Sequence, residues 1–448
     1  MKKILIAGGG RSSAYLIRYM LDHSTTYDWQ VRLGDFSEEL AKSRIQDHPR
    51  GHAFQFDVTD QRQREEEIKN CDIVISMLPP EMHNLLAADC IQYKKNMVTA
   101  SYVSKEIENM REEIKNAGII LLSECGLDPG IDHMSAVEII QKIKGQSGNI
   151  IHFSSYTGGL IAPAYNDNPW AYKFTWNPKN VILAGQGTAR YMKDHQYRYI
   201  PYNRIFSETQ LIEIENLGTF EGYANRDSLS YRKHYGLEDA PGILRGTLRM
   251  KGFCEAWNVF VKLGLTDDSY EMENSEMLSY REIIEAFLPQ HLSGSTEKKL
   301  SEFIGENPDS EIMKKIIWTG LLEDKQSGLP HASPAKILQD LLEKKWKLQT
   351  GDQDMVVMHH HFEYEIQNKR YETHSSLVVI GEDANYTAMA KTVGLPMAIA
   401  AKLILEGEIQ TKGLNIPVLP EIYRPILREL KRYGITFNEK HMINKEEF

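Results

Sequence analysis

Residues 2–23, KKILIAGGGRSSAYLIRYMLDH, place an apolar run, a glycine turn and an amphipathic stretch in immediate succession. The apolar run predicts a short buried strand, and the segment after the glycines predicts a helix. Gly8 and Gly10 let the backbone approach a pyrophosphate at a helix N-terminus, while Ser13 stands where a third glycine or alanine is usual. The turn therefore predicts a dinucleotide site, with a plain strand-to-helix turn as the alternative.

The pattern that begins here continues to about residue 125. Short apolar runs predict five further strands, at 30–35, 52–58, 72–78, 96–101 and 118–124. Helix-like segments alternate with them, including 104–118, for which Ser104 is the expected N-cap and Gly118 the expected stop. This order predicts right-handed βαβ units and an α/β fold with a Rossmann-type, doubly wound parallel sheet.

The expected cofactor site lies at the carboxyl ends of these strands. Asp35 ends the second strand, where an acid accepts the ribose hydroxyls of NAD and repels a 2′-phosphate, so NAD is favoured over NADP. Arg44 is expected to lie too far along the next helix to reverse this preference, whereas Arg32 stays open. The other expected cofactor-binding residues follow strand ends or belong to the glycine turn: Arg11, Ser12, Asp57, Val58, Leu78, Ala100, Ser101 and Gly126.

The later chain has a different character. Longer polar strands with aromatic residues at about 150–260 predict a mixed sheet, and 265–350 is charged and helical in pattern. Strand patterns return at about 355–380, and residues 386–407 predict a helix that breaks or restarts near Pro396. The expected domains are 1–128 plus 392–448, 129–264 plus 351–391, and a helical insert at 265–350.

Composition narrows the class of protein. A formal net charge of −10 argues against nucleic acid or an anionic membrane as the main partner. The four cysteines have neither CxxC spacing nor metal-ligand spacing, which indicates free thiols and a reducing compartment. The N-terminal apolar run is too short for a signal peptide, and no 18-residue apolar run occurs. We therefore expect a cytoplasmic protein.

A second stretch with candidate functional residues, ECGLDPGIDH at 124–133, lies at the end of the sixth expected strand. Gly126 would permit a close approach to nicotinamide. Asp128 before Pro129 has the pattern of an N-cap followed by a first-turn proline, and His133 would lie on the helix that follows. Asp128 could instead accept a proton or hold an ammonium group beside the nicotinamide.

Two further motifs carry charge or metal-binding potential. In RGTLR at 245–249, strand alternation places Arg245, Thr247 and Arg249 on one face, as a fork for carboxylates or as surface ion-pair partners. Arg226 could add a third cation. The three histidines at 359–361 would alternate faces of a strand and cannot converge on one ion, so no metal is expected.

Taken together, these motifs resemble saccharopine dehydrogenase of the glutamate-forming kind, also called saccharopine reductase. The matching strings run in family order over nearly the whole chain: VTASYVSKEI (98–107), GLDPGIDHMSA (126–136), SYTGGLIAPAYNDNPWAYKFTW (155–176), EGYANRDS (221–228), LRGTLRMKGF (244–253), FVKLGL (260–265) and AMAKTVGLPMAIAAKLILEGEIQTKGL (388–414).

The resemblance implies a Rossmann domain completed by C-terminal helices, a mixed-sheet α/β substrate domain and a small helical insert. It also implies NAD-dependent oxidation of saccharopine, a secondary amine with three carboxylates, to glutamate and 2-aminoadipate 6-semialdehyde. Asp128 and Tyr102 are the expected catalytic residues, with His133 as another proton relay. The expected substrate-binding residues are Ser101, Tyr102, Asp128, Thr157, Arg226, Arg245, Thr247 and Arg249.

This chain departs from the fungal pattern at two positions. Thr157 replaces a cysteine, and Asp35 replaces an arginine of NADP-using relatives. Two other functions stay open: a carboxynorspermidine dehydrogenase-like imine reductase, which needs fewer carboxylate-binding arginines, and a binding module that has lost catalysis. A homodimer is also left open.

Overall fold

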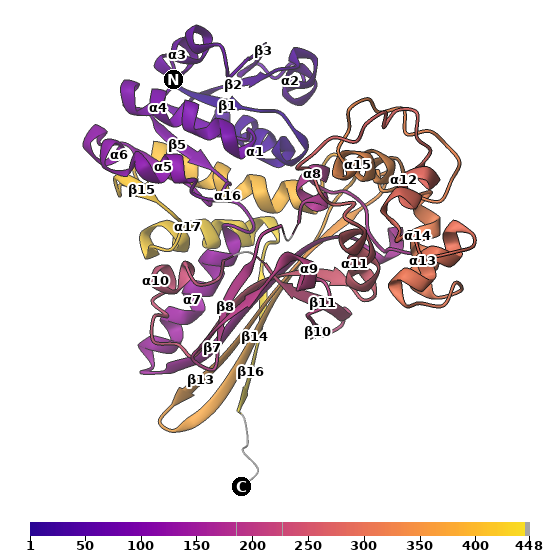
Figure 1. The fold of residues 1–448 in the computed structure, drawn as a ribbon. Coiled ribbons are helices and arrows are strands. Elements are labelled where there is room, and N and C mark those ends of the chain that lie inside the picture. The colour runs from indigo at the N-terminus through magenta and orange to yellow at the C-terminus, as the bar shows by residue number, and fades with distance from the viewer. Residues whose placement is uncertain (185, 226, 444–448) are drawn as a thin grey trace. The chain divides into compact units, whose positions relative to one another are not determined.

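The computed structural model describes residues 1–184, 186–225 and 227–443 (Figure 1). The chain forms two compact units, which differ from the three expected ranges. The first contains 1–150, 234–236 and 364–448, and the second contains 151–233 and 237–363. The helix after the sixth strand thus groups with the first unit, and residues 265–350 group with the second.

The first unit contains a seven-stranded parallel sheet in the order β15-β6-β5-β4-β1-β2-β3. This confirms the doubly wound parallel sheet. Its strands are β1 (Lys2–Ala7), β2 (Trp29–Asp35), β3 (Gly51–Gln55), β4 (Ile73–Ser76), β5 (Asn96–Thr99), β6 (Ile120–Leu122) and β15 (Gly413–Asn415). Its helices include α1 (Ala14–Ser24), α2 (Glu38–Ile45), α3 (Gln61–Lys69), α4 (His83–Tyr93), α5 (Lys105–Asn109), α6 (Arg111–Ala117), α7 (Ile131–Gly145), α16 (Ala388–Leu405) and α17 (Pro420–Leu430).

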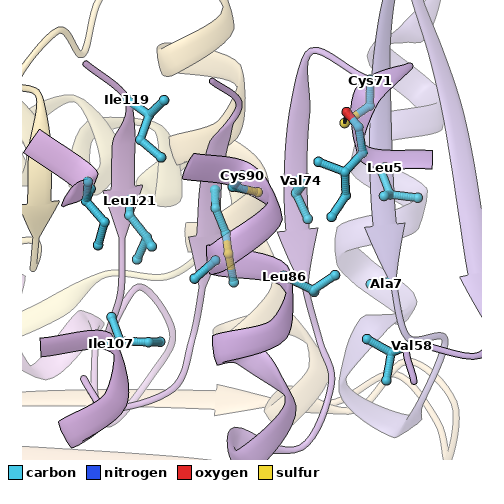
Figure 2. Close-up of a cluster of buried hydrophobic side chains, with 14 of the residues drawn as sticks. Leu5, Ala7, Val58, Cys71, Val74, Leu86, Cys90, Ile107, Ile119 and Leu121 are labelled. Atoms are coloured by element: carbon cyan, nitrogen blue, oxygen red, sulfur yellow. Dashed lines mark hydrogen bonds between the residues drawn. The ribbon is translucent and has the colours of Figure 1, made fainter. Parts of the chain in front are cut away.

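Apolar side chains from strands and helices form the core on one side of this sheet. Figure 2 shows Leu5, Val74 and Leu121 from three strands facing Leu86 and Cys90 of α4. The alternation of the strands places these side chains on the same face. This packing fixes the register of the strands, and with it the positions of the polar residues that follow their carboxyl ends.

The expected helix at 104–118 forms as two. Ser104 caps α5, accepting a hydrogen bond from the Ile107 N–H, and Gly118 ends α6 in a left-handed conformation, both as expected. Met110 has a non-helical backbone between the two helices.

The expected break at Pro396 is wrong, because α16 is one helix with Pro396 inside it. A proline removes only one backbone donor, and burial of nearly the whole helix stabilises the remaining turns. By length and composition α16 could also cross a membrane, although no unbroken apolar run suggested this. Of its 18 residues, 83% are buried inside the structure, as in a core helix.

The second unit contains a mixed sheet in the order β10-β11-β12-β7-β13. β11 pairs antiparallel with β10 and β12, whereas β12 and β7 are parallel. The strands are β7 (Asn149–Ile161), β8 (Ala189–Lys193), β9 (Gln196–Ile200), β10 (Thr209–Ile214), β11 (Gly218–Ala224), β12 (Gly242–Met250) and β13 (Asp354–Ile366). The helices include α8 (Pro178–Ile182), α9 (Tyr202–Ile205), α10 (Tyr231–Tyr235), α11 (Phe253–Leu263), α12 (Tyr280–Phe287), α13 (Thr296–Ile304), α14 (Glu311–Thr319) and α15 (Pro334–Lys345).

The chain passes from one unit to the other within β7, α10 and β13. After β13 it returns to the first unit as β14 (Lys369–Ile380), which pairs antiparallel with β16 (Phe437–Ile443). The mixed sheet and the helices between 265 and 350 match the sequence-based expectation of element type.

Candidate active site

The glycine turn between β1 and α1 has the geometry that a pyrophosphate site needs. Gly8 has a positive φ of 101°, and a Cβ there would lie 3.1 Å from the Met77 carbonyl oxygen. A Cβ at Gly10 would meet no atom of the described residues within 4 Å, so that side of the turn is open. The Ser13 hydroxyl donates to the Gly10 carbonyl at 2.8 Å and fastens the turn, which explains a serine at the third position.

Asp35 lies directly beside this turn. One oxygen of its carboxylate accepts the Gly9 N–H at 2.7 Å, and the other accepts the Ser37 N–H at 2.9 Å. Each carboxylate oxygen has a further lone pair. The ribose hydroxyls of a dinucleotide are suitable donors for them.

The expectation that Arg44 lies too far from the turn is wrong. Its Nε donates to the Gly9 carbonyl at 3.2 Å, because helical side chains lean towards the N-terminus of their helix and that end of α2 lies beside the turn. Burial lowers the pKa of its guanidinium. Arg32, in contrast, is engaged by Glu67 through two bonds of 2.7 and 2.8 Å.

The remaining expected cofactor residues lie after the carboxyl ends of strands β3 to β6. The Asp57 carboxylate accepts two hydrogen bonds from Thr59, which lower its pKa. The Val58 side chain belongs to the core of Figure 2, so only its backbone can reach a ligand. Gly126 has a structural reason to be glycine, since a Cβ there would lie 2.8 Å from the Ala100 Cβ. Leu78 and Ser101 follow β4 and β5.

The stretch 124–133 folds differently from the expected capped helix. α7 begins at Ile131 with Gly130 as its N-cap, and the Asp128–Pro129 peptide is cis. Asp128 as N-cap is therefore wrong. Its carboxylate instead accepts a hydrogen bond of 3.0 Å from the Tyr102 hydroxyl. The two expected catalytic side chains thus lie together in the first unit, on the segments that follow β6 and β5.

His133 is fully buried in α7. Its Nε2 lies 2.8 Å from a Glu124 oxygen, and its Nδ1 lies 2.6 Å from the Tyr235 hydroxyl. Both ring nitrogens therefore have protein partners. A direct proton exchange with substrate would require these bonds to break, so this geometry favours a structural role for His133.

The second unit contains the expected anion-binding residues. Arg249 of β12 is 3% exposed, and its guanidinium lies within 6 Å of the rings of Tyr172, Tyr223 and Phe253. Among the described residues its Nε has no hydrogen-bond partner and no carboxylate pairs with it. The surface ion-pair interpretation is therefore wrong for Arg249.

Its neighbours on the sheet add polar groups to the same strands. Thr157 of β7 pairs with Thr247 of β12, and the buried Thr157 hydroxyl has no partner among the described residues. Arg245 is buried with its guanidinium 4.2 Å from the Tyr231 ring centroid. Arg226 lies outside the described residues. The Arg249 guanidinium donates to the Leu248 carbonyl at 3.0 Å, but it has no carboxylate partner among the described residues. With the unsatisfied Thr157 hydroxyl it favours an anionic, hydrogen-bonding ligand.

One buried residue that the sequence interpretation missed is His83. It bridges the Ser76 and Ser101 hydroxyls, and no local sequence pattern marks it. The three histidines at 359–361 lie in β13, where neighbouring side chains alternate between faces.

Two known family models match this chain. The saccharopine dehydrogenase C-terminal domain model matches residues 126–435, and the saccharopine dehydrogenase NADP binding domain model matches 4–122. Saccharopine dehydrogenase [NADP(+), L-glutamate-forming] of Pyricularia oryzae is 33% identical over 98% of this chain and 99% of its own.

Two further relatives place the chain in context. The apo saccharopine dehydrogenase (L-Glu forming) of Saccharomyces cerevisiae superposes with a TM-score of 0.89 at 31% identity, covering 99% of this chain and 100% of the other. Alpha-aminoadipic semialdehyde synthase of Arabidopsis thaliana is 36% identical over 95% of this chain, which spans 42% of that protein. This chain thus spans less than half of that longer relative.

The parallel sheet with its open glycine turn, together with the match to the NADP binding domain model, places the first unit in the class of Rossmann-type α/β folds. The chain belongs to the saccharopine dehydrogenase family.

Proposed function

We propose that this protein oxidises saccharopine with NAD to L-glutamate and 2-aminoadipate 6-semialdehyde. The observation that carries the proposal is Arg249, a buried guanidinium among aromatic rings that pairs with no acid of the described chain. A substrate with three carboxylates supplies the missing anion. Charge-assisted hydrogen bonds of this kind are strong in a buried site.

The proposed chemistry has two steps. The C–H bond next to nitrogen on the lysine-derived arm breaks, and the bound dinucleotide supplies the hydride acceptor. The resulting imine adds water and releases glutamate and the semialdehyde. The amine must lose a proton before the first step, and Asp128 with its hydrogen-bonded Tyr102 is the proposed group that positions the amine and takes this proton.

NAD rather than NADP is the proposed cofactor, although the family model and several relatives are named for NADP. Asp35 supports NAD, because its carboxylate next to Gly9 repels a 2′-phosphate. Arg44 favours the competing choice, since it reaches the same turn and none of the described acids forms an ion pair with it. We also propose a cytoplasmic location, supported by four buried, unbridged cysteines.

The decisive assay mixes the protein with saccharopine and NAD, follows NADH at 340 nm, and identifies the products by mass spectrometry. Glutamate with the semialdehyde supports the proposal; lysine with 2-oxoglutarate, or no turnover with either dinucleotide, contradicts it. Arg249→Met should raise KM for saccharopine about tenfold or more, because a lost bond to a carboxylate costs about 1.5–3 kcal/mol. Arg204→Met, which removes an exposed ion pair with Glu208, is the matched control and should leave KM unchanged.

A further inference from the structure

His83 is a buried residue that the proposed chemistry does not use. It is the first residue of α4 and is 1% exposed. Its Nδ1 lies 2.7 Å from the Ser76 hydroxyl, and its Nε2 lies 2.8 Å from the Ser101 hydroxyl and 3.2 Å from the Thr99 hydroxyl. The ring thus links the end of β4 to the end of β5 through hydroxyl groups.

The protonation state of this ring decides what it can do. Burial lowers the pKa of His83 to about 4, so the imidazole is neutral at neutral pH. A neutral imidazole has one N–H donor and one acceptor nitrogen. The ring can therefore accept a hydrogen bond at one nitrogen and donate one at the other. The donors then run either from Ser76 towards Ser101 or from Ser101 towards Ser76.

The two directions give Ser101 opposite properties. If Nδ1 carries the proton, the Ser101 hydroxyl donates inward to Nε2 and only its lone pairs face outward. If Nε2 carries the proton, it donates to Ser101, Ser76 donates to Nδ1, and the Ser101 hydrogen is free to point outward. Ser101 is partly exposed, and its carbonyl accepts the Glu124 N–H at 3.0 Å, which fixes the backbone that carries the hydroxyl.

We propose that His83 is a positioning residue that holds the Ser101 hydroxyl as a hydrogen-bond donor to a substrate carboxylate. This inference rests on the proposed function, because an anionic substrate selects the donating direction. The series runs Ser76 to His83 to Ser101 to carboxylate, with each hydroxyl or N–H donating to the next group. No proton is transferred.

Two isosteric variants test the proposal. In H83Q the amide nitrogen lies near the position of Nε2 and can still donate to Ser101, whereas the shorter side chain of H83N reaches only the position of Nδ1. We expect H83N to raise KM for saccharopine about three- to tenfold, with kcat changed less and the Kd for NADH unchanged, as for one lost hydrogen bond. H83Q should stay within about twofold of the wild type.

Further variants distinguish a role of His83 in positioning the Ser101 hydroxyl from an effect on protein stability alone. C90A removes a fully buried core side chain from the same helix, so it should lower Tm without raising KM. S101A should raise KM at least as much as H83N, and the double variant should be no worse than S101A alone. Additive losses in this cycle, or equal losses in H83N and H83Q, would overturn the proposal.

The direction of the hydrogen bonds has its own readout. In 15N-histidine-labelled protein, the resonances that disappear in H83Q should report an unprotonated Nδ1 and a protonated Nε2. The opposite tautomer would overturn the proposal. A wild type without saccharopine turnover would overturn the proposed function together with this inference, whereas an active wild type with the wrong tautomer or an additive cycle overturns this inference alone.

Discussion

Asp35 and Arg44 oppose each other over the choice of dinucleotide, because both contact Gly9. We expect the wild type to have a higher kcat/KM with NAD than with NADP. D35A should narrow this difference in kcat/KM, because it removes the hydrogen bonds to the ribose of NAD and also the repulsion of the 2′-phosphate of NADP. R44A should weaken NADP use while sparing NAD, and R32A, whose arginine is already engaged by Glu67, is the matched control. Equal kcat/KM values for the two cofactors in the wild type would disprove NAD preference.

Asp128 offers a cleaner test now that Gly130 is the N-cap of α7. Neither D128N nor D128A removes a helix cap, so both should keep the wild-type Tm within a few degrees. Loss of a group that assists proton transfer costs on the order of 10²–10⁴ in rate, and we expect D128N to lose kcat/KM by such a factor. D128N should still bind NADH normally in a fluorescence titration. Turnover close to that of the wild type would move the proton acceptor elsewhere.

The low pKa of His83, about 4 against an ordinary value near 6.5, makes a prediction about stability. Between these two values the unfolded chain binds a proton that the folded chain excludes, so stability is lost as the pH falls from 6.5 towards 4. At pH 5 the loss from this one group is about 2 kcal/mol. Thermal unfolding at pH 7 and pH 5 should show a larger fall in Tm for wild type than for H83Q. Equal falls in Tm for the wild type and H83Q would contradict this prediction.

At the scale of elements, the contact between α1 and α16 depends on Gly394. A Cβ there would lie 2.9 Å from the Leu16 backbone nitrogen and 3.1 Å from its Cβ, so one helix must shift. We expect G394A to destabilise the protein by about 1–3 kcal/mol and to weaken NADH binding, since α1 follows the glycine turn. G145A, at an open helical position of α7, should be neutral or slightly stabilising. Equal Tm values for G394A and wild type would show that the helices separate without cost.

The elements show which features the sequence could predict. Apolar runs identified the six strands up to residue 122. Burial on both faces of a parallel sheet leaves a strong local signal in β4, β5 and β6, whereas β3, at the edge of the sheet, has no fully buried residue. β15 is only three residues long, and its partner β6 lies almost 300 residues away, so no local pattern marks it. The prediction of a break at Pro396 was wrong for the same reason, because the packing that keeps α16 continuous involves residues far away in the sequence.

The candidate site shows the same contrast between features that a local sequence pattern predicts and features that depend on packing. Asp35 ends β2 as the sequence pattern predicted, Ser101 lies two residues beyond the end of β5, and Arg249 and Thr247 both lie on β12. The reach of Arg44 and the partners of Asp128 depend on how separate segments pack. His83 was missed because a single histidine after a proline pair carries no motif, and only the fold brings Ser76 and Ser101 to its ring.

At the scale of the whole molecule, the first unit is assembled from both ends of the chain. α16 and β15, drawn towards yellow in Figure 1, lie against elements from the indigo N-terminal part. α16 packs on α1, and β15 extends the sheet beside β6. The dinucleotide-binding sheet is therefore incomplete until the last tenth of the chain is present.

This assembly predicts that truncation has a sharp threshold. A chain ending at Ile380 lacks α16, in which Leu395, Met397, Ile399 and Leu403 are buried. At about 1.5–3 kcal/mol for each such side chain, the loss of at least about 6 kcal/mol is comparable with the whole stability of a typical domain. We expect this variant to bind no NADH in a fluorescence titration and to show no cooperative thermal transition of the first unit. A chain ending at Thr436 lacks β16 and the residues after it; most of the described residues of β16 are exposed, so this variant should bind NADH as the full chain does. Wild-type NADH affinity in the shorter variant would mean that residues 1–150 form the cofactor site without the C-terminal segment.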